Sequence, residues 1–559
     1  MRDYDVIVIG SGSGGLTAAL ALARAGRRVV VFEQHYLPGG YSQSFDLKGY
    51  RFSPGIHYVG ALGPGASLRR AYEGLGIADD LEFFELNPDG YDHVVVGDER
   101  FDIPKGKERF AERLKARFPA EASGIDHYFD VIGRLNEEVG WAAPIHSILD
   151  AALLPVHMRT TLRYGLLPLA RFLDGCTDDP LLRAILSIQA GDHAMAPARA
   201  PTILHAGLQG YYFDGACYPR GGGHAIPDTM IRHIRAHGGD VVLRTAVTRI
   251  LVEGDAVVGV RLADGREVSA DVVVSNADPG ITWGRLLEPQ HVGARMRRRI
   301  EHTHYSLSTL SLFLAVDMDL RGIGLDSGNV WYSETPDIDA AYEFAARSNL
   351  ADAASVPGLF FNVTTLKDPT ARQDGIHTVE AIALASVAAF ERWRGTDSDT
   401  RGDDYEHLKT HLGDRMLDAV ERFAPGLRER TVFRTLGTPL TNMHFLHATE
   451  GAIYGTEKTV RNLGPFSFSV DTHLRGLYQC GASTIAPGIN GVTCSGLDAA
   501  AAVLGCGRDD LLTATGQRLR IYAAEDPSTW PSERPALAHR VLRAVTAGAR
   551  GLTDGSGLE

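Results

Sequence analysis

A glycine-rich turn between a buried strand and a helix constrains the fold of this chain more than any other feature. Residues 6–9 are continuously apolar, as expected of a parallel strand covered on both faces. The chain continues through Gly10, Gly12, Gly14 and Gly15 into residues 16–25, whose alanines and leucines predict a helix. Such glycines permit a tight turn, close approach of a pyrophosphate and close helix–strand packing. The order predicts a dinucleotide-binding unit whose helix N-terminus receives phosphate.

An acidic residue at the end of the next strand supports this interpretation. Residues 28–32 form a second strand-like run, and Glu33 follows it, 23 residues after Gly10. An acid there accepts hydrogen bonds from ribose hydroxyls and disfavours a 2′-phosphate, so FAD or NAD is expected and NADP is not. An ordinary strand-to-helix turn without a ligand is the alternative. The complete order of strand, helix, strand and acid favours the dinucleotide.

Composition indicates a large enzyme without a nucleic-acid surface. A chain of 559 residues with 44% apolar residues exceeds one hydrophobic core and predicts two or three subdomains. The net charge of −13 opposes binding to a phosphate backbone, so we expect no nucleic-acid partner. Five scattered cysteines form no CxxC pair, and we expect no metal site. No basic and apolar leader precedes the first strand, so a cytoplasmic protein is expected.

Pieces of the nucleotide-binding unit recur far apart along the chain. After residue 215 the sequence returns to a helix, to strand-like runs at 241–251 and 257–262, and to a buried strand that ends before Asn276. We therefore predict an α/β fold in which a Rossmann-like domain is interleaved with a mixed-sheet substrate domain and a helical cap. The predicted division assigns 1–65, 216–300 and 465–505 to the nucleotide domain, 66–215 to the cap and part of the substrate domain, 301–464 to the substrate-domain sheet, and 506–559 to a partly disordered C-terminal extension.

A second loop, near the C-terminus, has the composition of a ligand-binding turn. Residues 476–480 form a short strand, and a loop rich in glycines and hydroxyls leads to a helix that we expect to begin near Val492. This helix N-terminus could bind the isoalloxazine or ribityl-phosphate part of a long cofactor whose adenosine part is held by the N-terminal unit. For this loop alone, a tight connection without a ligand is the alternative.

Together these motifs resemble the phytoene desaturase superfamily of FAD enzymes over nearly the whole chain. The resemblance is carried by Gly10 to Glu33, Gly39-Gly40, Pro219 to Gly222, Asn276 to Pro279 and the loop from Gly481 to Gly491. Residues 53–60, 438–442 and 451–455 are similar to the carotenoid isomerase and retinol saturase branch. The resemblance implies a glutathione-reductase-type FAD fold, a noncovalently bound flavin, and a conjugated isoprenoid or other apolar polyene as substrate.

The resemblance also implies a set of cofactor contacts. In chain order, these expected FAD contacts are Gly10, Gly12, Gly14, Gly15, Glu33, Gln34, Gly39, Gly40, Tyr41, Ser42, Val247, Gly481, Ala482, Asn490, Gly491 and Val492. Ala482 departs from the family pattern, because many relatives have an acidic residue there that binds the ribitol. Backbone amides or water must replace that hydrogen bond in this chain.

Three side chains are candidates for catalysis. His57 and Tyr58 follow the ribityl segment in a glycine-bounded loop, where a histidine titrates near neutrality and a tyrosine can donate a proton or a hydrogen bond. The pair could instead only pack beside the cofactor. Arg220 could face the flavin and stabilise an anionic reduced ring, or it could form a surface ion pair. Tyr454 and Asn442 are weaker candidates, since such residues more often form a pocket wall.

The segment 141–173 could lie on a membrane surface. It mixes leucines and isoleucines with His157, Arg159, Arg163 and Arg171, and three prolines break it into short helices. A protein that is peripheral on the membrane would meet its apolar substrate there. Helices that cap the substrate cavity are the alternative, and the two interpretations are compatible. A second basic stretch at 537–552 has no assigned role.

The favoured function is an FAD-dependent oxidoreductase that saturates, desaturates or isomerises carbon–carbon double bonds of a carotenoid- or retinoid-like polyene. Flavin exchanges a hydride with carbon, and protein groups would hold the double bond and protonate or deprotonate the neighbouring carbon. A noncatalytic isoprenoid-binding carrier of the same fold and a flavin amine oxidase are the alternatives. The intact glycine turn and Glu33 favour an enzyme over a carrier, and the sequence contains no recognisable aromatic cage for an amine.

Overall fold

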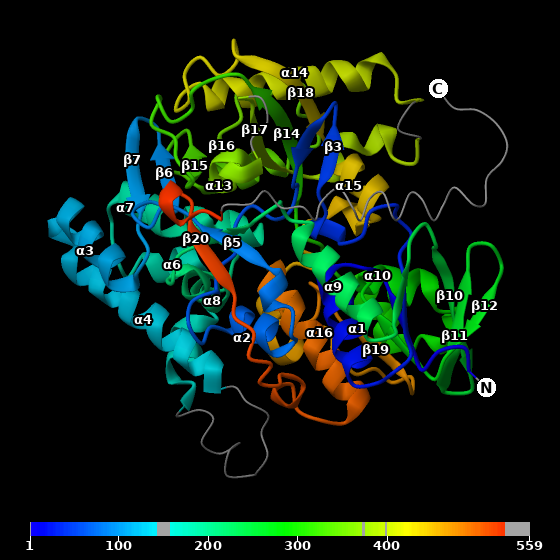
Figure 1. Cartoon of the computed structure of the whole chain (residues 1–559). Helices are drawn as coiled ribbons and strands as arrows, with labels where there is room; N and C mark the ends of the chain where they lie inside the picture. The colour runs from blue at the N-terminus through cyan, green and yellow to red at the C-terminus, as the bar shows by residue number, and fades with distance from the viewer. Residues whose placement is uncertain (1, 142–156, 372–374, 397–399, 532–559) are drawn as a thin grey trace.

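Two large sheets with helices around them make up the protein (Figure 1). The computed structural model describes residues 2–141, 157–371, 375–396 and 400–531. The first sheet is parallel and has the strand order β19-β13-β1-β2-β9. Its strands are β1 (Val6–Ile9), β2 (Val29–Phe32), β9 (Asp240–Val242), β13 (Val272–Ser275) and β19 (Leu477–Gln479). Segments from the beginning, middle and end of the chain therefore lie side by side in one sheet.

Both faces of this sheet are covered, which explains the unbroken apolar run of its first strand. Val6 and Val8 point into a core shared with three helices, α1 (Ser13–Arg24), α9 (Ala225–Ala236) and α16 (Gly488–Leu504). Ile7 and Ile9 point to the other side, where they pack against an antiparallel sheet of β10 (Val247–Glu253), β11 (Ala256–Leu262) and β12 (Glu267–Ser269). Alternate side chains of one strand thus serve two different cores.

The sequence predicts one strand-like run at 241–251, but the structure divides it into two strands. These are the end of β9 and the start of β10, which belong to different sheets. Between them Arg244 has a positive φ of 54°, so the chain turns out of the parallel sheet at this residue. The sequence does not reveal this turn, because the residues on both sides of it are apolar and each half is buried in its own sheet.

The second sheet is mixed and has the strand order β18-β14-β17-β16-β15-β6-β7. Its strands are β6 (Asp92–Val96), β7 (Glu99–Ile103), β14 (Ser308–Val316), β15 (Asn329–Ser333), β16 (Gly358–Val363), β17 (His377–Ala385) and β18 (Thr431–Gly437). One face packs against α14 (Asp403–Val420), at the top of Figure 1. Trp331 and Phe360 on the other face join the core of the helical layer. Residues 66–215 therefore contribute two strands to this sheet as well as helices.

The helical layer lies beside the second sheet, at the left of Figure 1. It contains α3 (Lys107–Arg117), α4 (Ala122–Trp141), α6 (Leu169–Leu173), α7 (Pro180–Ser187) and α8 (Thr202–Tyr212). Part of the segment 141–173, residues 142–156, lies outside the described residues, as does the stretch 537–552. Among the helices that the structure describes, none combines the length and the apolar character needed to cross a bilayer.

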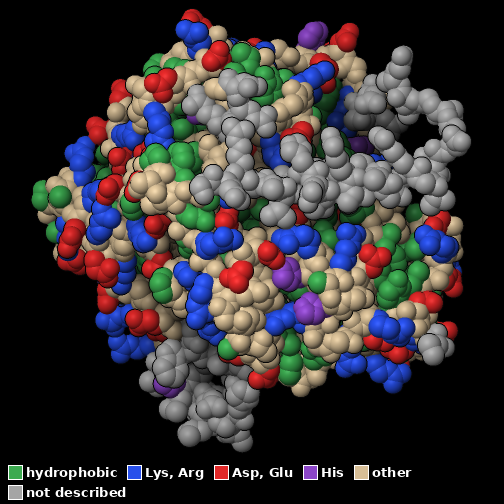
Figure 2. Space-filling model, in the orientation of Figure 1, with side chains coloured by type: hydrophobic (Ala, Val, Ile, Leu, Met, Phe, Trp, Pro, Cys, Tyr) green, Lys and Arg blue, Asp and Glu red, His purple; other side chains and the backbone are tan. Residues whose placement is uncertain are grey.

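Charges of both signs are interspersed over the surface. On the face shown in Figure 2, lysines and arginines alternate with aspartates and glutamates and form no continuous basic field.

A further three-stranded sheet joins β20 (Arg520–Ala523), β5 (Glu82–Glu85) and β8 (Cys217–Pro219). The described part of the predicted C-terminal extension is thus anchored by strand pairing to the body of the protein.

Candidate active site

A cavity of about 930 Å³ lies between the two large sheets, at the upper end of the size range of ligand sites. The residues that follow four parallel strands all line it. Gly10 follows β1, Glu33 follows β2, Asn276 follows β13 and Cys480 follows β19. The crevice outside the carboxyl ends of such strands is where open α/β sheets bind ligands.

The glycine turn presents bare backbone to this cavity. Gly10, Gly12 and Gly14 line it, and Gly10 has a φ of +91° that suits the sharp exit from β1. A Cβ at Gly12 would lie 2.7 Å from Nδ2 of Asn276, which stands between the N-terminal turn and the C-terminal loop. Gly15 does not line the cavity. Its Cβ would lie 2.3 Å from the Gly10 carbonyl oxygen, so it serves the close helix–strand packing that the sequence analysis expected of it.

Glu33 is held in place but retains the capacity to bind a ribose. Its Oε2 accepts hydrogen bonds from the Ser11 backbone N–H at 2.8 Å and from the Ser11 hydroxyl at 2.7 Å, and its Oε1 accepts one from the His35 N–H at 2.8 Å. A carboxylate has about four acceptor positions, so one remains for a hydroxyl of a bound nucleotide. Glu33 and Gln34 both line the cavity.

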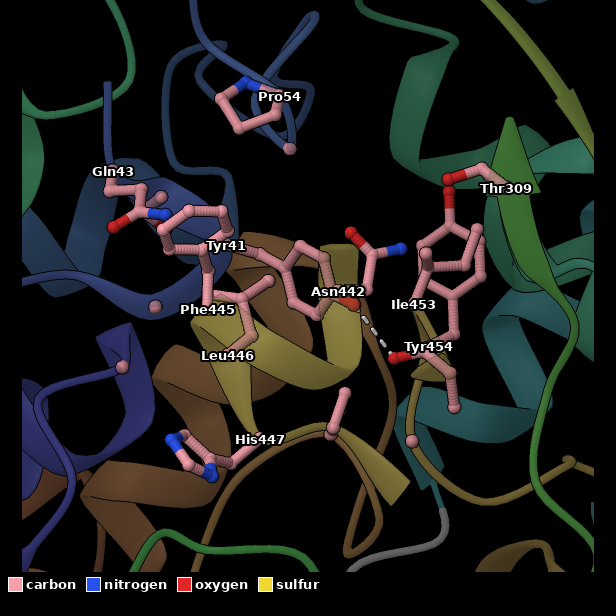
Figure 3. Close-up of a pocket in the computed structure, with 18 of the residues that line it drawn as sticks. Tyr41, Gln43, Pro54, Thr309, Asn442, Phe445, Leu446, His447, Ile453 and Tyr454 are labelled. Atoms are coloured by element: carbon pink, nitrogen blue, oxygen red, sulfur yellow. Dashed lines mark hydrogen bonds between the residues drawn. The ribbon is translucent and has the colours of Figure 1, made fainter. Parts of the chain in front are cut away.

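The segment between the turn and the substrate region follows the cavity wall. Gly39, Gly40, Tyr41 and Ser42 all line the cavity. The Ser42 hydroxyl lies 2.8 Å from that of Ser13 in the first turn of α1. The Tyr41 hydroxyl donates a hydrogen bond of 2.9 Å to the Ala452 carbonyl, the dashed line of Figure 3. This bond joins two walls of the cavity that are far apart in sequence.

The C-terminal loop and one face of the helix that follows it line the cavity, and this helix begins earlier than the sequence predicts. Helix α16 starts at Gly488, one turn before Val492. Gly481, Ala482 and Val492 line the cavity, and so does Val247 at the start of β10. Asn490 and Gly491 do not. Asn490 accepts a hydrogen bond from the Ser67 hydroxyl at its exposed side, and Gly491 packs against the Ala486 carbonyl.

The three catalytic candidates occupy different positions. His57 lines the cavity, and its Nδ1 lies 3.1 Å from Oε2 of the fully buried Glu380. Tyr58 does not border the cavity, and its hydroxyl instead donates a 2.5 Å hydrogen bond to Asp192. Arg220 does not line it either, because its guanidinium is buried in an ion pair with Glu82. The structure therefore brings only His57 directly to the cavity.

Tyr454 and Asn442, the weaker candidates, do line the cavity, and both are labelled near the centre of Figure 3. Asn442 donates a hydrogen bond to the Ser308 hydroxyl at 3.2 Å. The remaining wall is largely apolar and aromatic. Its members from the second sheet and the helical layer include Ile188, Trp331, Tyr342, Phe360, Ile382 and Leu384.

A cluster of buried ionisable groups lies beside His57, and the sequence does not predict it. Lys367 is fully buried and donates hydrogen bonds to the His57 carbonyl at 2.6 Å and to Asn329 Oδ1 at 2.5 Å. Burial lowers the pKa of Lys367 to about 7, and burial raises the pKa of Asp92 to about 6 and that of Asp192 to about 8. Of these groups, Asp192 lines the cavity.

Neither a spacing nor a motif marks this cluster in the sequence. Its members come from separate elements, and only the packing of the second sheet against the helical layer brings them together. Across the described residues, no group of three or more histidines, cysteines or acids is placed to hold a metal ion.

Comparison with known proteins identifies the family. The family model for flavin containing amine oxidoreductases matches residues 13–504. An all-trans-retinol 13,14-reductase of Danio rerio is 30% identical over 531 residues, which cover 90% of this chain and 86% of that protein. Prolycopene isomerase 1 of an Oncidium hybrid cultivar is 26% identical, covering 88% and 83%. A solved oxidoreductase from Methanosarcina mazei has a TM-score of 0.61 at 18% identity, covering 88% and 99%.

These matches confirm three predictions from the sequence: the α/β fold class, the superfamily and FAD as cofactor. The bare glycine backbone, the spare acceptor of Glu33 and the loop at the start of α16 fit an extended flavin nucleotide. The chain is an FAD-dependent oxidoreductase that belongs to the family of flavin containing amine oxidoreductases.

Proposed function

We propose that this enzyme acts on carbon–carbon double bonds of a long apolar polyene, retinoid- or carotenoid-like, by saturation, desaturation or isomerisation. One observation carries the proposal: the cavity continues from the glycine turn into a chamber walled by Trp331, Phe360 and other apolar side chains. Such a wall suits a conjugated hydrocarbon, which offers few hydrogen-bonding groups. The names of the two relatives, a retinol reductase and a prolycopene isomerase, support the same substrate class.

The glycine turn and Glu33 would hold the adenosine diphosphate half of FAD, and Gly481, Ala482 and Val492 would lie along its flavin half. Bound FAD supplies hydride exchange with carbon. The chain's own groups orient the substrate and exclude water. His57 is held by Glu380, whose Oε2 lies 3.1 Å from its Nδ1, so its ring has a defined orientation at the cavity wall.

Amine oxidation is the alternative within the family. A protonated amine needs a fixed negative charge or an aromatic cage as its partner. Burial raises the pKa of Asp192 to about 8, so this carboxyl is largely neutral at pH 7 and is a poor partner for an ammonium group. Trp331, Phe360 and Tyr342 also line the cavity and offer aromatic faces to either substrate, so turnover of amines and of polyenes decides between the two.

The proposed function predicts a change of mass in a polyene. Purified holoenzyme should be yellow and release flavin on denaturation, which a carrier without flavin would not do. With the flavin chemically reduced under anaerobic conditions, we expect a retinoid or carotenoid to gain two mass units on saturation. With the flavin oxidised, a loss of two units indicates desaturation, and unchanged mass with altered retention indicates isomerisation. Turnover of primary amines without any change to a polyene panel would overturn the proposal.

We also propose that the protein takes its substrate from a membrane surface. Leu162, Leu166 and Leu167 are 61%, 46% and 41% exposed, around the short π-helix Thr161–Gly165. Arg159 and Arg163 are exposed beside them. Leucines next to cations have the composition of a surface that inserts shallowly into anionic lipid.

Vesicle flotation tests this membrane contact. Replacing Leu162, Leu166 and Leu167 by serine should lower the partition coefficient of the holoenzyme onto anionic phosphatidylserine vesicles, measured from the floating fraction, by about 100-fold, since three leucines at about 1 kcal/mol of apolar burial each contribute about 3 kcal/mol. The matched control is Phe466→Ser, which removes another exposed apolar side chain, 62% accessible, from a distant part of the chain. Equal flotation of the triple variant and the wild type would refute the contact.

A further inference from the structure

Asp192 is fixed at the cavity wall by the packing of its neighbours. It lies in the 3-10 helix Ile188–His193, between α7 and α8, and both Ile188 and Gly191 also line the cavity. A Cβ at Gly191 would lie 2.4 Å from the Trp331 ring, so the backbone of this turn is pressed directly against the indole. A turn held this closely against an aromatic wall gives the adjacent carboxyl a defined position.

The Asp192 carboxyl and the flavin-facing loop border the same cavity, which Asp192, Tyr454, Gly481 and Ala482 all line. Gly455, the residue after Tyr454, packs against the loop: its Cβ would lie 2.7 Å from Ser483 Oγ and 3.3 Å from Ala482 Cβ. A substrate held in this cavity beside the flavin would therefore share the chamber with Asp192.

The surroundings of Asp192 leave one of its oxygens for the substrate. Tyr58 donates its hydroxyl to Oδ2 at 2.5 Å, and its ring stacks on Tyr212 with centroids 4.4 Å apart. Within the described residues, Oδ1 makes no hydrogen bond and no cation forms an ion pair with this carboxyl. The nearest cation, Lys367, directs its amine to the oxygens of His57, Asn329 and Asn362 instead.

We propose that Asp192 is the proton donor when the double bond is saturated and that Tyr58 positions it from behind the cavity wall. This assignment rests on the proposed function and adds a catalytic acid to it. Tyr58, a catalytic candidate from the sequence, becomes a positioning residue because its hydroxyl reaches Asp192 and not the cavity.

In the proposed step the O–H bond of the Asp192 carboxyl breaks, and its proton forms a C–H bond with one carbon of the double bond. The other carbon would take the hydride that reduced FAD supplies when bound, so the π bond would be lost and the substrate would gain two electrons and two protons. Asp192 is left as a carboxylate and regains its proton from solvent. The chemical reductant of the anaerobic assay, a two-electron donor, would restore the reduced flavin.

The protonation state of Asp192 supports this role. Burial raises its pKa and the hydrogen bond from Tyr58 lowers it, the charge of Asp92 raises it and that of Lys367 lowers it, and the net pKa is about 8. The titratable groups that interact electrostatically with it are Asp92, Lys367 and the tyrosines Tyr58, Tyr91, Tyr211, Tyr212, Tyr342 and Tyr454. Burial raises the pKa of every one of these phenols, so they stay neutral at pH 8.

Asp192→Asn tests the assignment, because the amide keeps the shape of the carboxyl and cannot donate its proton as an acid. In the holoenzyme with reduced flavin, we expect kcat for saturation to fall by about 100-fold or more, as for the loss of a general acid, with KM and flavin content changed less than threefold. An infrared band of a protonated carboxyl that disappears as the pH rises through about 8 should be present in the wild type and missing in the variant.

Two further variants separate chemistry from structure. Tyr58→Phe removes the hydrogen bond that lowers the pKa of Asp192, so the alkaline limb of the kcat profile and the infrared titration should both move to higher pH. A merely structural role of Tyr58 would leave that limb in place. Asp339→Asn is the matched control, since Asp339 is a part-buried carboxyl whose pKa burial also raises, and it does not line the cavity.

The outcomes distinguish this assignment from the proposed function. If the wild type saturates a polyene and Asp192→Asn keeps its kcat within threefold, the proton donor is another group and only this assignment fails. If the wild type changes no polyene in either flavin state, both the proposed function and the assignment of Asp192 are wrong.

Discussion

Replacing Gly14 by alanine is expected to weaken FAD binding by about 100-fold. The added Cβ would lie 2.8 Å from Asn276 Oδ1, 3.1 Å from the Val492 carbonyl oxygen and 3.3 Å from Gly481 Cα. Two of these neighbours are backbone atoms, one in the C-terminal loop and one in the first turns of α16 that follows it. The Asn276 side chain cannot swing aside, because its Nδ2 already stands next to Gly12.

The methyl group must therefore separate the start of α1 from the C-terminal loop, and these two walls are expected to hold opposite halves of the cofactor. Overpacking of this kind costs about 1–3 kcal/mol, and a 100-fold loss of affinity corresponds to about 2.7 kcal/mol. Flavin titration of the apoprotein by fluorescence quenching measures the effect.

The matched control is Gly207→Ala in α8, where an added Cβ meets nothing within 4 Å. We expect the affinity of this variant for FAD to equal that of the wild type. An affinity of Gly14→Ala within threefold of the wild type would show that the two loops do not close on the cofactor as the structure indicates.

The N-terminal part of the site could be predicted because its signals are local. The turn from Gly10 to Gly15 and the acid at Glu33 lie within one strand-helix-strand unit, and each glycine has a role that follows from backbone geometry. The expected FAD contacts in this unit line the cavity, apart from Gly15, which packs the helix onto the strand.

The expected C-terminal contacts depend on helix register, which a motif in the sequence does not give. With 3.6 residues per turn, positions 488, 489 and 492 of α16 face the cavity while 490 and 491 face away. A match of sequence positions to a family motif does not distinguish a residue that lines a site from one that packs the lining in place. Asn490 and Gly491 therefore pack behind the cavity wall, and their direct contact with FAD stays a prediction.

The buried cluster beside His57 could not be found from sequence, because its contacts join distant segments. Tyr58 and Asp192 are 134 residues apart, and Lys367 and His57 are 310 residues apart. Charged residues are almost always on the surface, so a lone Lys or Asp within an apolar segment carries no signal of burial until the sheets are assembled. The sequence allows two roles for Arg220, at the flavin or in a surface ion pair. Only the folded structure shows that it forms a buried ion pair with Glu82.

Replacing Lys367 by methionine is expected to lower the free energy of unfolding by about 3–5 kcal/mol, as for the loss of one partner from a buried ionic group. Methionine keeps the apolar stem but leaves three buried oxygens, of His57, Asn329 and Asn362, without the hydrogen bonds that the amine donates at 2.6, 2.5 and 3.2 Å. Each unsatisfied acceptor costs about 1–3 kcal/mol, and the negative charges of Glu380 and Asp92 lose their nearest compensating cation.

Urea denaturation followed by circular dichroism measures this loss, and Lys115→Met is its matched control. Lys115 pairs with Asp126 at 2.8 Å, but both side chains are substantially exposed, and such surface pairs contribute about 0–1 kcal/mol. Equal stability of the two variants would mean that water or a rearranged side chain satisfies the three oxygens, and the wall that positions His57 would then be less rigid than its hydrogen bonds indicate. A large loss confined to Lys367→Met ties the orientation of His57 and the shape of the cavity to a group 310 residues away in the chain.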